Sequence, residues 1–250
     1  PVPRRGLAET PEEAVGLGEK VMAFINDEGH EASARLAGQR GAFPNFEGSR
    51  LHQQGKPEIR NATVTTIAPT GTISIIAGAS SGIEPLFALA FVRHVLDGKE
   101  LLEVNPFFET LAKEEGFYSE SLMRKIAEDG HLTHFQEVPE RIRRLFVTAH
   151  DITPEDHIRM QGAFQRYTDN AGSKTVNFAY DATEDDVAKV YRLAYALGCK
   201  GVTIYRDGSR SEQVLYKGTV STPKVQAKEG GGESGGEIKP RARRDVIHGS

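Results

Sequence analysis

Residues 61–85 read NATVTTIAPTGTISIIAGASSGIEP, and no other stretch is as informative about the fold. After Ala62, β-branched residues fill positions 63–67, and the run 62–67 predicts a buried strand. The run breaks at Pro69-Thr70-Gly71-Thr72 and resumes as an apolar stretch over 73–77, where we expect a second strand. A small, hydroxyl-rich turn after a buried strand exposes N–H and O–H donors that suit a phosphate. An ordinary turn without a ligand is the alternative.

The candidate phosphate ligands are six consecutive residues of this turn. Gly71 would let the backbone approach an anion that a Cβ atom would hold off. The hydroxyls of Thr70, Thr72 and Ser74 would add directed donors. No lysine follows in the Walker arrangement, so the turn is not that of a P-loop NTPase. We therefore predict a substrate-phosphate site formed by Pro69, Thr70, Gly71, Thr72, Ile73 and Ser74.

Six further sequence blocks stand on either side of this turn. They are Gly41–Pro44, Asn105–Glu109, Phe146–Ile152, His157–Gln161, Ser173–Asn177 and Gly201–Arg210. In this order and at this spacing, across about residues 10–215, they resemble the ribonucleotide reductases, in the adenosylcobalamin-dependent (class II) form. A single block would be a weak signal, whereas an ordered series is specific.

The expected fold class is α/β. Residues 173–178 and 201–206 read as strands that are apolar on both faces, and they enclose a helix beginning at Thr183. A strand, a helix and a strand in this order form a parallel crossover unit. The resemblance adds that residues 1–215 are the C-terminal portion of a ten-stranded α/β barrel, leaving residues 216–250 as a separate tail.

Helix start signals recur along the chain. Thr10-Pro11-Glu12-Glu13 is a capping box with proline at the first helical position, and it predicts a helix that continues to Arg40. Thr153 and Thr183 begin weaker versions, with Asp in place of the usual Glu. Shorter helices are expected after Asn105, after Ser119 and around 139–145, and strands at 62–67, 73–77, 88–95, 173–178 and 201–206.

Composition narrows the functional classes. The net charge of −4 argues against a general nucleic-acid binder, so no direct nucleic-acid partner is expected. No apolar run approaches the roughly 20 residues that cross a membrane. The single cysteine, Cys199, excludes an internal disulfide and a multi-cysteine metal site, and it favours a cytoplasmic location. A chain that starts at Pro1 suggests a fragment or a processed form.

The apolar pattern stops near Tyr216. Residues 230–237 are a low-complexity run of glycine, glutamate and serine that cannot form a core, so we predict a disordered tail. The basic run Arg241–Arg244 could touch phosphate or RNA, although a solvated linker is the favoured interpretation.

Several other polar residues have competing interpretations. Glu84 is expected to hold its loop rather than to transfer protons. Lys174 lies inside an apolar strand, where it either reaches the surface, which we favour, or pairs with an anion. Tyr205 is followed by Arg206, whereas the reductase branch with a separate radical-generating subunit carries two adjacent tyrosines, and this difference favours the cobalamin branch. Tyr205 as a plain core aromatic stays open, as does the role of Asn177, and we expect no metal site.

The resemblance implies reduction of the ribose 2′-hydroxyl of a ribonucleotide, with a thiyl radical, a reducing cysteine pair and adenosylcobalamin. Cys199 lacks the Asn and Glu neighbours of the radical cysteine, which would therefore lie outside this chain. We expect a substrate-binding part of a ribonucleoside-diphosphate reductase that is inactive alone. Its partners would be the N-terminal portion of the barrel and a thioredoxin-type reductant. The alternative is a non-catalytic nucleotide-phosphate-binding or regulatory module.

Overall fold

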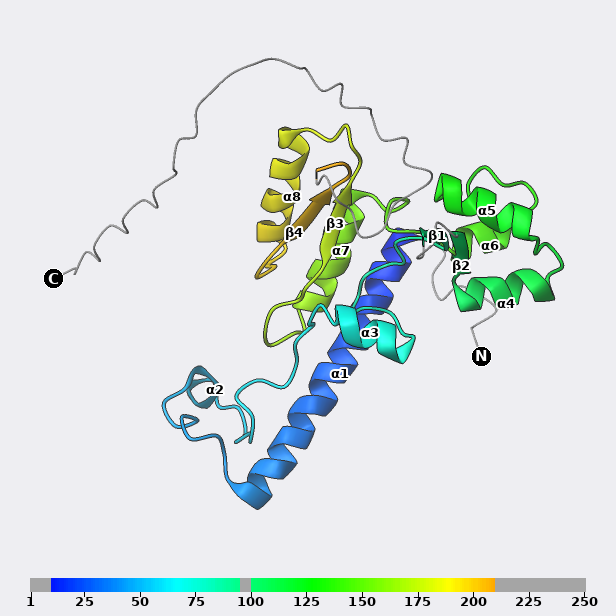
Figure 1. Ribbon diagram of the computed structural model, residues 1–250. Helices are drawn as coiled ribbons and strands as arrows, with labels where there is room; N and C mark the ends of the chain where they lie inside the picture. Colours follow the sequence, from blue (N-terminus) through cyan, green and yellow to red (C-terminus); the bar gives the residue numbers. More distant parts are fainter. Residues whose placement is uncertain (1–9, 95–99, 210–250) are drawn as a thin grey trace, which may run out of the picture. The chain divides into compact units, whose positions relative to one another are not determined.

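The computed structural model describes residues 10–94 and 100–209 (Figure 1). The predicted disordered tail lies outside these residues. Helices and strands alternate irregularly along the chain. Their order is α1 (Pro11–Arg40), α2 (Arg50–Gln53), α3 (Gly71–Ala77), β1 (Ala90–His94), β2 (Glu100–Val104), α4 (Pro106–Glu114), α5 (Glu120–Asp129), α6 (Glu140–Leu145), α7 (Pro154–Gln165), β3 (Thr175–Phe178), α8 (Glu184–Ala196) and β4 (Thr203–Arg206).

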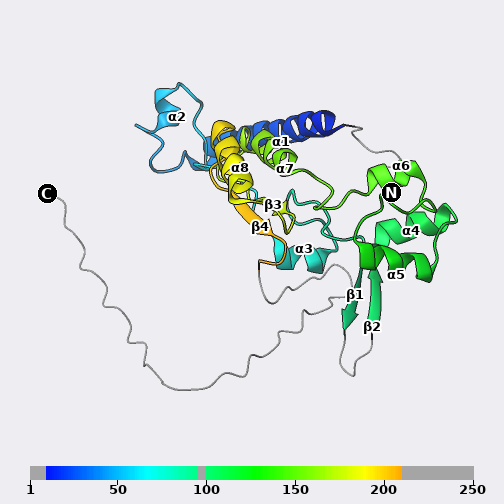
Figure 2. The same cartoon turned by 90° about the horizontal axis from the view of Figure 1, so that it is seen from above.

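The long helix α1 begins and ends as its sequence predicts. The Thr10 side chain accepts from the Glu13 N–H, the Glu13 side chain bonds back to the Thr10 N–H, and Gly41 follows the last turn. Helix α1 packs along α7, and the two run side by side in Figure 2. Gly18 allows this approach, because a Cβ atom there would lie 2.7 Å from the Phe164 ring.

The predicted strand at 62–67 is not a regular strand. One bridge, between Ile67 and Gly172, is its only ladder contact among the described residues. The carboxylate of Asp169 instead accepts the N–H groups of Val64 at 2.7 Å and Thr65 at 3.3 Å. Backbone groups of residues 170–173 also bond to Thr65 and Ile67, so a distant loop takes the place of a regular neighbouring strand. Of residues 62–67 only Thr65 is buried, which corrects the predicted burial of this segment.

The predicted strand at 73–77 is wrong, because Gly71–Ala77 forms helix α3. Thr70 has φ of 49°, the only positive value for a non-glycine residue in the described part of the chain, and it turns the backbone sharply. The Ser74 N–H then bonds to the Thr70 carbonyl, and the helix continues from there. Short apolar runs fit either structure, and here the turn determines the outcome.

An antiparallel hairpin and three helices form the first core. Strand β1 lies within the predicted 88–95 segment and pairs with β2 from Ala90↔Val104 onward. Helix α5 contacts both strands, and Figure 1 shows α4 and α6 near the same hairpin. Leu111, Leu122 and Ile126, from the two helices predicted after Asn105 and Ser119, are buried in this core with the fully buried Phe108.

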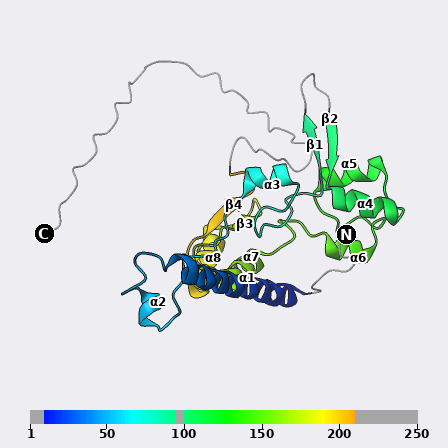
Figure 3. The ribbon, with the colours of Figure 1, turned by 90° about the horizontal axis from the view of Figure 1, so that it is seen from below.

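A parallel pair of strands carries the second core. Strand β3 pairs with β4 in register Thr175↔Thr203 to Phe178↔Arg206, and α8 connects them, as predicted. Figure 3 shows α8 and α7 beside this pair, and α7 contacts both α8 and β3. The buried residues of this core are Ile158, Val176, Phe178, Val190 and Ala194.

The described residues do not close a barrel. They contain two sheets of two strands each, and β3 and β4 have one partner apiece. An unpaired edge of a buried parallel strand normally pairs with another strand.

None of the described helices combines the length and apolar composition that crossing a bilayer requires.

Candidate functional site

The predicted phosphate turn lies on an accessible bend. Pro69, Gly71 and Thr72 are exposed, as is 63% of Ile73. A Cβ atom added at Gly71 would meet nothing within 4 Å, so this backbone faces open space. The first N–H groups of a helix have no partner inside the helix, and α3 begins at Gly71. The bend thus presents backbone donors at a position that an anion could reach.

The hydroxyls of the bend divide into two kinds. The Ser74 hydroxyl is buried and donates to the Gly71 carbonyl at 2.8 Å, which leaves it turned inward. The Thr70 hydroxyl is half-buried and lies 3.5 Å from the Ser81 hydroxyl. Thr72 is exposed beside Gly71. Of the three residues predicted as hydroxyl donors, Thr72 is the only exposed one.

A second loop, residues 80–85, contacts the backbone just before Gly71. The Ser81 hydroxyl donates to the Pro69 carbonyl. Gly82 has φ of +56°, and a Cβ atom there would lie 3.1 Å from the Ala68 carbonyl oxygen, so only glycine allows this approach without strain. The Glu84 N–H closes the loop by bonding to the Ser81 carbonyl at 3.0 Å.

Lys174 is buried rather than at the surface, which corrects the favoured prediction. Its residue surface is 3% exposed, and Nζ lies 3.2 Å from Glu84 Oε2. The other carboxylate oxygen of Glu84 accepts the Thr175 N–H at 2.5 Å. Burying a lysine is costly unless an opposite charge pairs with it, and Glu84 is that partner. The holding role predicted for Glu84 agrees with this geometry.

His157 completes this buried polar group. Its Nε2 lies 2.9 Å from the Ala149 carbonyl, and its Nδ1 lies 2.7 Å from Lys174 Nζ. A carbonyl only accepts and an ammonium only donates, so the neutral ring carries its proton on Nε2. Burial and the Lys174 charge lower the pKa of His157 to about 4, against the opposing bond to Ala149.

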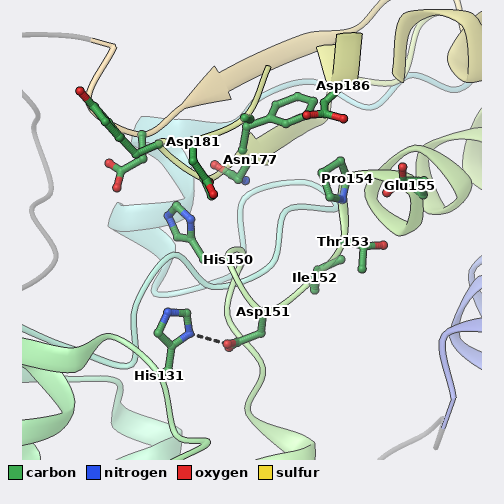
Figure 4. Close-up of a pocket in the computed structure, with 15 residues that line it drawn as sticks. His131, His150, Asp151, Ile152, Thr153, Pro154, Glu155, Asn177, Asp181 and Asp186 are labelled. Atoms are coloured by element: carbon green, nitrogen blue, oxygen red, sulfur yellow. Dashed lines mark hydrogen bonds and ion pairs between the residues drawn. The ribbon is translucent and has the colours of Figure 1, made fainter. Parts of the chain in front are cut away.

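A cavity of about 560 Å³ lies at the carboxyl ends of β3 and β4 (Figure 4). Asn177 and Tyr180 line it from β3 and the following turn, and His150 and Asp151 line it from the loop before α7. The carboxyl ends of parallel strands are where α/β proteins commonly bind ligands. Asn177, whose role the sequence left open, lines this cavity.

The cavity is acidic. Five carboxylates line it, from Asp151, Glu155, Asp181, Asp186 and Asp207. Asp151 accepts from the Thr148 N–H at 2.7 Å and lies 2.5 Å from His131 Nδ1, a pair drawn in Figure 4. Burial alone would raise the pKa of Asp151, but these bonds lower it below 3.8. An anionic phosphate is disfavoured here, whereas residues 61–83 carry no charged side chain.

Tyr205 and Cys199 are not among the residues that line the cavity. Tyr205 lies opposite Asn177 in the β3–β4 register and is half-buried. Cys199 is half-buried beside the second core, and burial raises the pKa of its thiol above 9.0, so it is protonated at neutral pH. In the parts of the chain that the structure describes, no group of three or more His, Cys, Asp or Glu residues could hold a metal ion.

Sequence reasoning missed the His131–Asp151 pair and the anchor at Asp169. The two partners of the first pair are 20 residues apart, and Asp169 binds residues more than 100 positions away. Neither arrangement follows a local spacing rule, so no periodicity would have revealed it. The one local signal was the polar His150–Asp151 step after an apolar run.

The fold is α/β, with an exposed bend at Gly71 and a cavity at the carboxyl ends of the parallel strands. Sequence comparison identifies the family of proteins to which this chain belongs. The family model of the ribonucleotide reductase barrel domain matches residues 50–205. Because this match covers more than half of the chain, the chain belongs to the ribonucleotide reductase family through its barrel domain. The expected fold, a portion of that α/β barrel, is confirmed.

Two similar proteins carry the name of a vitamin B12-dependent reductase. The chain is 57% identical to the vitamin B12-dependent ribonucleoside-diphosphate reductase of Thermoplasma acidophilum, over 87% of this chain and 28% of that protein. It is 49% identical to the enzyme of the same name from Mycobacterium tuberculosis H37Rv, over 84% of this chain and 29% of that protein. The chain thus spans less than a third of these relatives.

A solved structure supports the same fold. The class Id ribonucleotide reductase alpha subunit of Actinobacillus ureae aligns with a TM-score of 0.64 at 23% identity. The alignment covers 80% of this chain and 35% of that subunit. At this identity the likeness concerns the backbone arrangement alone.

Proposed function

We propose that this chain is the substrate-phosphate-binding part of an adenosylcobalamin-dependent ribonucleoside-diphosphate reductase. The observation that carries the proposal is the bend at Gly71, which is uncharged, open to an anion and inside the family-matched segment. The N–H groups of Gly71, Thr72 and Ile73 and the Thr72 hydroxyl hold the phosphates. Pro69 and Thr70 fix the turn, and the Ser74 hydroxyl secures the first turn of α3.

The chemistry of the reaction lies outside the residues of this chain. Ribose reduction by a thiyl radical needs a radical cysteine and a reducing pair, whereas the sequence has one cysteine with a protonated, half-buried thiol. The role of this chain is therefore to bind and orient the nucleotide, which lowers the entropic part of the barrier. A thioredoxin-type reductant would act on cysteines elsewhere in the cytoplasmic enzyme.

The described residues do not form a complete cobalamin site. Pockets for drug-sized ligands measure about 300–1,000 Å³, and a corrinoid is far larger than a drug, so the 560 Å³ cavity cannot enclose one. The cofactor assignment rests on the names of the relatives and on the Tyr205-Arg206 pair. When bound, adenosylcobalamin supplies the initiating radical.

Calorimetric titration with a ribonucleoside diphosphate tests the bend. In Gly71→Val the new side chain projects into the open space where the phosphate would lie, so we expect affinity to fall about tenfold or more. The control is Gly38→Val, which adds the same side chain at an exposed glycine of α1 that also faces open space. Control and wild type should bind equally.

The titration is made with the chain alone and with the chain mixed with the part of the Thermoplasma acidophilum relative that it does not cover. Absence of binding in both samples, or unchanged affinity in Gly71→Val, would contradict the assignment. Turnover should appear only in the mixture. Reductase activity of the isolated chain would contradict the proposed division of roles.

A non-catalytic nucleotide-binding or regulatory module is the second candidate, favoured by the lack of any second cysteine. Such a module would bind the nucleotide through the same bend. The neighbouring DNA separates the two functions. An adjoining reading frame that encodes a cysteine between Asn and Glu supports the reductase, whereas an unrelated neighbour supports the module.

A further inference from the structure

A buried polar group joins four separate segments behind the bend. Lys174, the residue before β3, contacts Glu84 at 3.2 Å and His157 on α7 at 2.7 Å. His157 in turn bonds to the Ala149 carbonyl, and Glu84 accepts the Thr175 N–H. We call Lys174, Glu84 and His157 the brace. It links the loop at 80–85, the loop before α7, α7 itself and β3.

The hydrogen bonds of the brace fix its charges. A lysine ammonium has three donors, and Lys174 has three acceptors: Glu84 Oε2, His157 Nδ1 and the Thr175 carbonyl at 3.2 Å. A neutral amine could satisfy only two of them as a donor. Burial lowers the pKa of Lys174 and the Glu84 carboxylate opposes this shift, and the three acceptors around Nζ match the three N–H groups of the ammonium form. Lys174 is therefore assigned as a hydrogen-bonded cation whose role is to hold other groups.

The brace reaches the bend through the loop at 80–85. Glu84 lies at the end of this loop, and the Glu84 N–H donates to the Ser81 carbonyl at 3.0 Å. Ser81 then donates to the Pro69 carbonyl and lies 3.5 Å from the Thr70 hydroxyl. Each contact connects neighbouring groups, so a continuous path runs from β3 to the residue that starts the bend.

We propose that the brace is a positioning device for the bend at residues 67–74, and that Lys174 is its central positioning residue. The inference rests on the proposed function, because it assigns to the bend a ligand whose binding needs a fixed shape. Thr70 holds a left-handed conformation that costs a non-glycine residue free energy, and it persists only where surrounding contacts impose it. The loop held by Glu84 supplies such contacts.

Two substitutions separate positioning from stability. Lys174→Met leaves the Glu84 carboxylate without its cation and His157 Nδ1 without a donor, so both stability and positioning should suffer. Adding Glu84→Gln removes the unpaired charge while the amide oxygen can still accept the Thr175 N–H. The double variant should therefore regain much of the stability lost by Lys174→Met, although it lacks the link between β3 and the loop.

Amide hydrogen exchange and titration with a ribonucleoside diphosphate are the readouts, and Lys125→Met at an exposed lysine of α5 is the control. In both Lys174 variants we expect exchange over residues 67–85 to rise about tenfold, and exchange over residues 106–129 in the first core to stay unchanged. Affinity for the nucleotide should fall at least fivefold in both variants. The control should match wild type.

Wild-type exchange over residues 67–85 in the double variant would overturn the proposal, since the brace would then not hold the bend. Equal losses over 67–85 and 106–129 would also overturn it, because Lys174 would then act on global stability alone. If wild type fails to bind the nucleotide, the proposed function fails, and the exchange measurement still decides whether the brace positions the bend.

Discussion

His157 shows how one buried ring makes stability depend on pH. The unfolded ring takes up a proton as pH falls through about 6.5, whereas the folded ring does so only near pH 4. Protonation between these values therefore favours the unfolded state, and stability is lost as pH falls through this window. At about 1.4 kcal/mol per pH unit, the loss reaches about 3 kcal/mol at pH 4.

We expect His157→Gln to lack this part of the pH dependence. Lys174 and His150 disfavour protonation of the His157 ring, and Asp156 favours it. The dependence of stability on pH therefore reflects all of these neighbours. Denaturant unfolding of wild type and variant from pH 7 to pH 4 measures it. The control is His134→Gln at an exposed position. A His157→Gln variant with the wild-type slope would contradict the lowered pKa of His157 as the source of this pH dependence.

Asp169 anchors Val64 and Thr65 within the segment 62–67. It accepts from the N–H groups of Val64 and Thr65, from Asn26 at 3.2 Å and from His30 at 3.0 Å. Burial alone would raise the pKa of Asp169, but these hydrogen bonds lower it below 3.8. The stabilisation is thus present at neutral pH and is lost as pH falls through the lowered value.

Asp169→Asn should cost about 2 kcal/mol at pH 7, because hydrogen bonds to a charged acceptor contribute about 1.5–3 kcal/mol and the amide replaces one acceptor oxygen by a donor. The difference from wild type should shrink below pH 4. Asp27→Asn, at an exposed position of α1, is the control. Equal stability of Asp169→Asn and wild type in urea titrations at pH 7 would be evidence against the anchor.

At the scale of the elements, those formed by local contacts could be predicted from the sequence, and those formed by distant partners could not. Helices α1 and α8 follow from capping boxes at Thr10 and Thr183, which depend on residues three apart. The β3–α8–β4 unit follows from apolar runs around a helix. The segment at 62–67 could not be predicted in the same way, because its partner lies more than 100 residues away.

In the candidate site, too, local features could be predicted from the sequence and contacts between distant residues could not. The bend was visible in the order of small and hydroxyl residues, but the inward turn of Ser74 depends on α3, which the β-branched run 73–77 did not predict. Burial of Lys174 depends on Glu84 and His157, which are 90 and 17 residues away. Pairing between distant residues carries no local pattern, so the sequence left both lysine alternatives open.

Helix α4 offers a matched test of the first core. Phe107 and Phe108 are adjacent, but Phe107 is 55% exposed and Phe108 is 0% exposed. Phe108→Ala should cost about 3–5 kcal/mol, because it leaves a cavity against Phe146 and Phe117. Phe107→Ala should change stability by about 0.5 kcal/mol or less. Similar losses in thermal or urea unfolding would contradict the packing of α4.

At the scale of the whole molecule, the proposed function assigns nucleotide binding to this chain and the radical chemistry to residues outside it. The described residues supply an uncharged, anion-accessible bend, a brace behind it and an acidic cavity at the strand ends. Relatives with the reductase name are more than three times as long as the matched segment. The open edges of the two-stranded sheets agree with a barrel that further strands complete.

The most direct test is a crystal structure of this chain, together with the complementary part of a reductase relative, with a bound ribonucleoside diphosphate. We predict phosphate oxygens within hydrogen-bond distance of the N–H groups of Gly71, Thr72 and Ile73. A diphosphate bound elsewhere, such as among the carboxylates around Asp151, or a bend covered by packed side chains in that complex, would contradict the account.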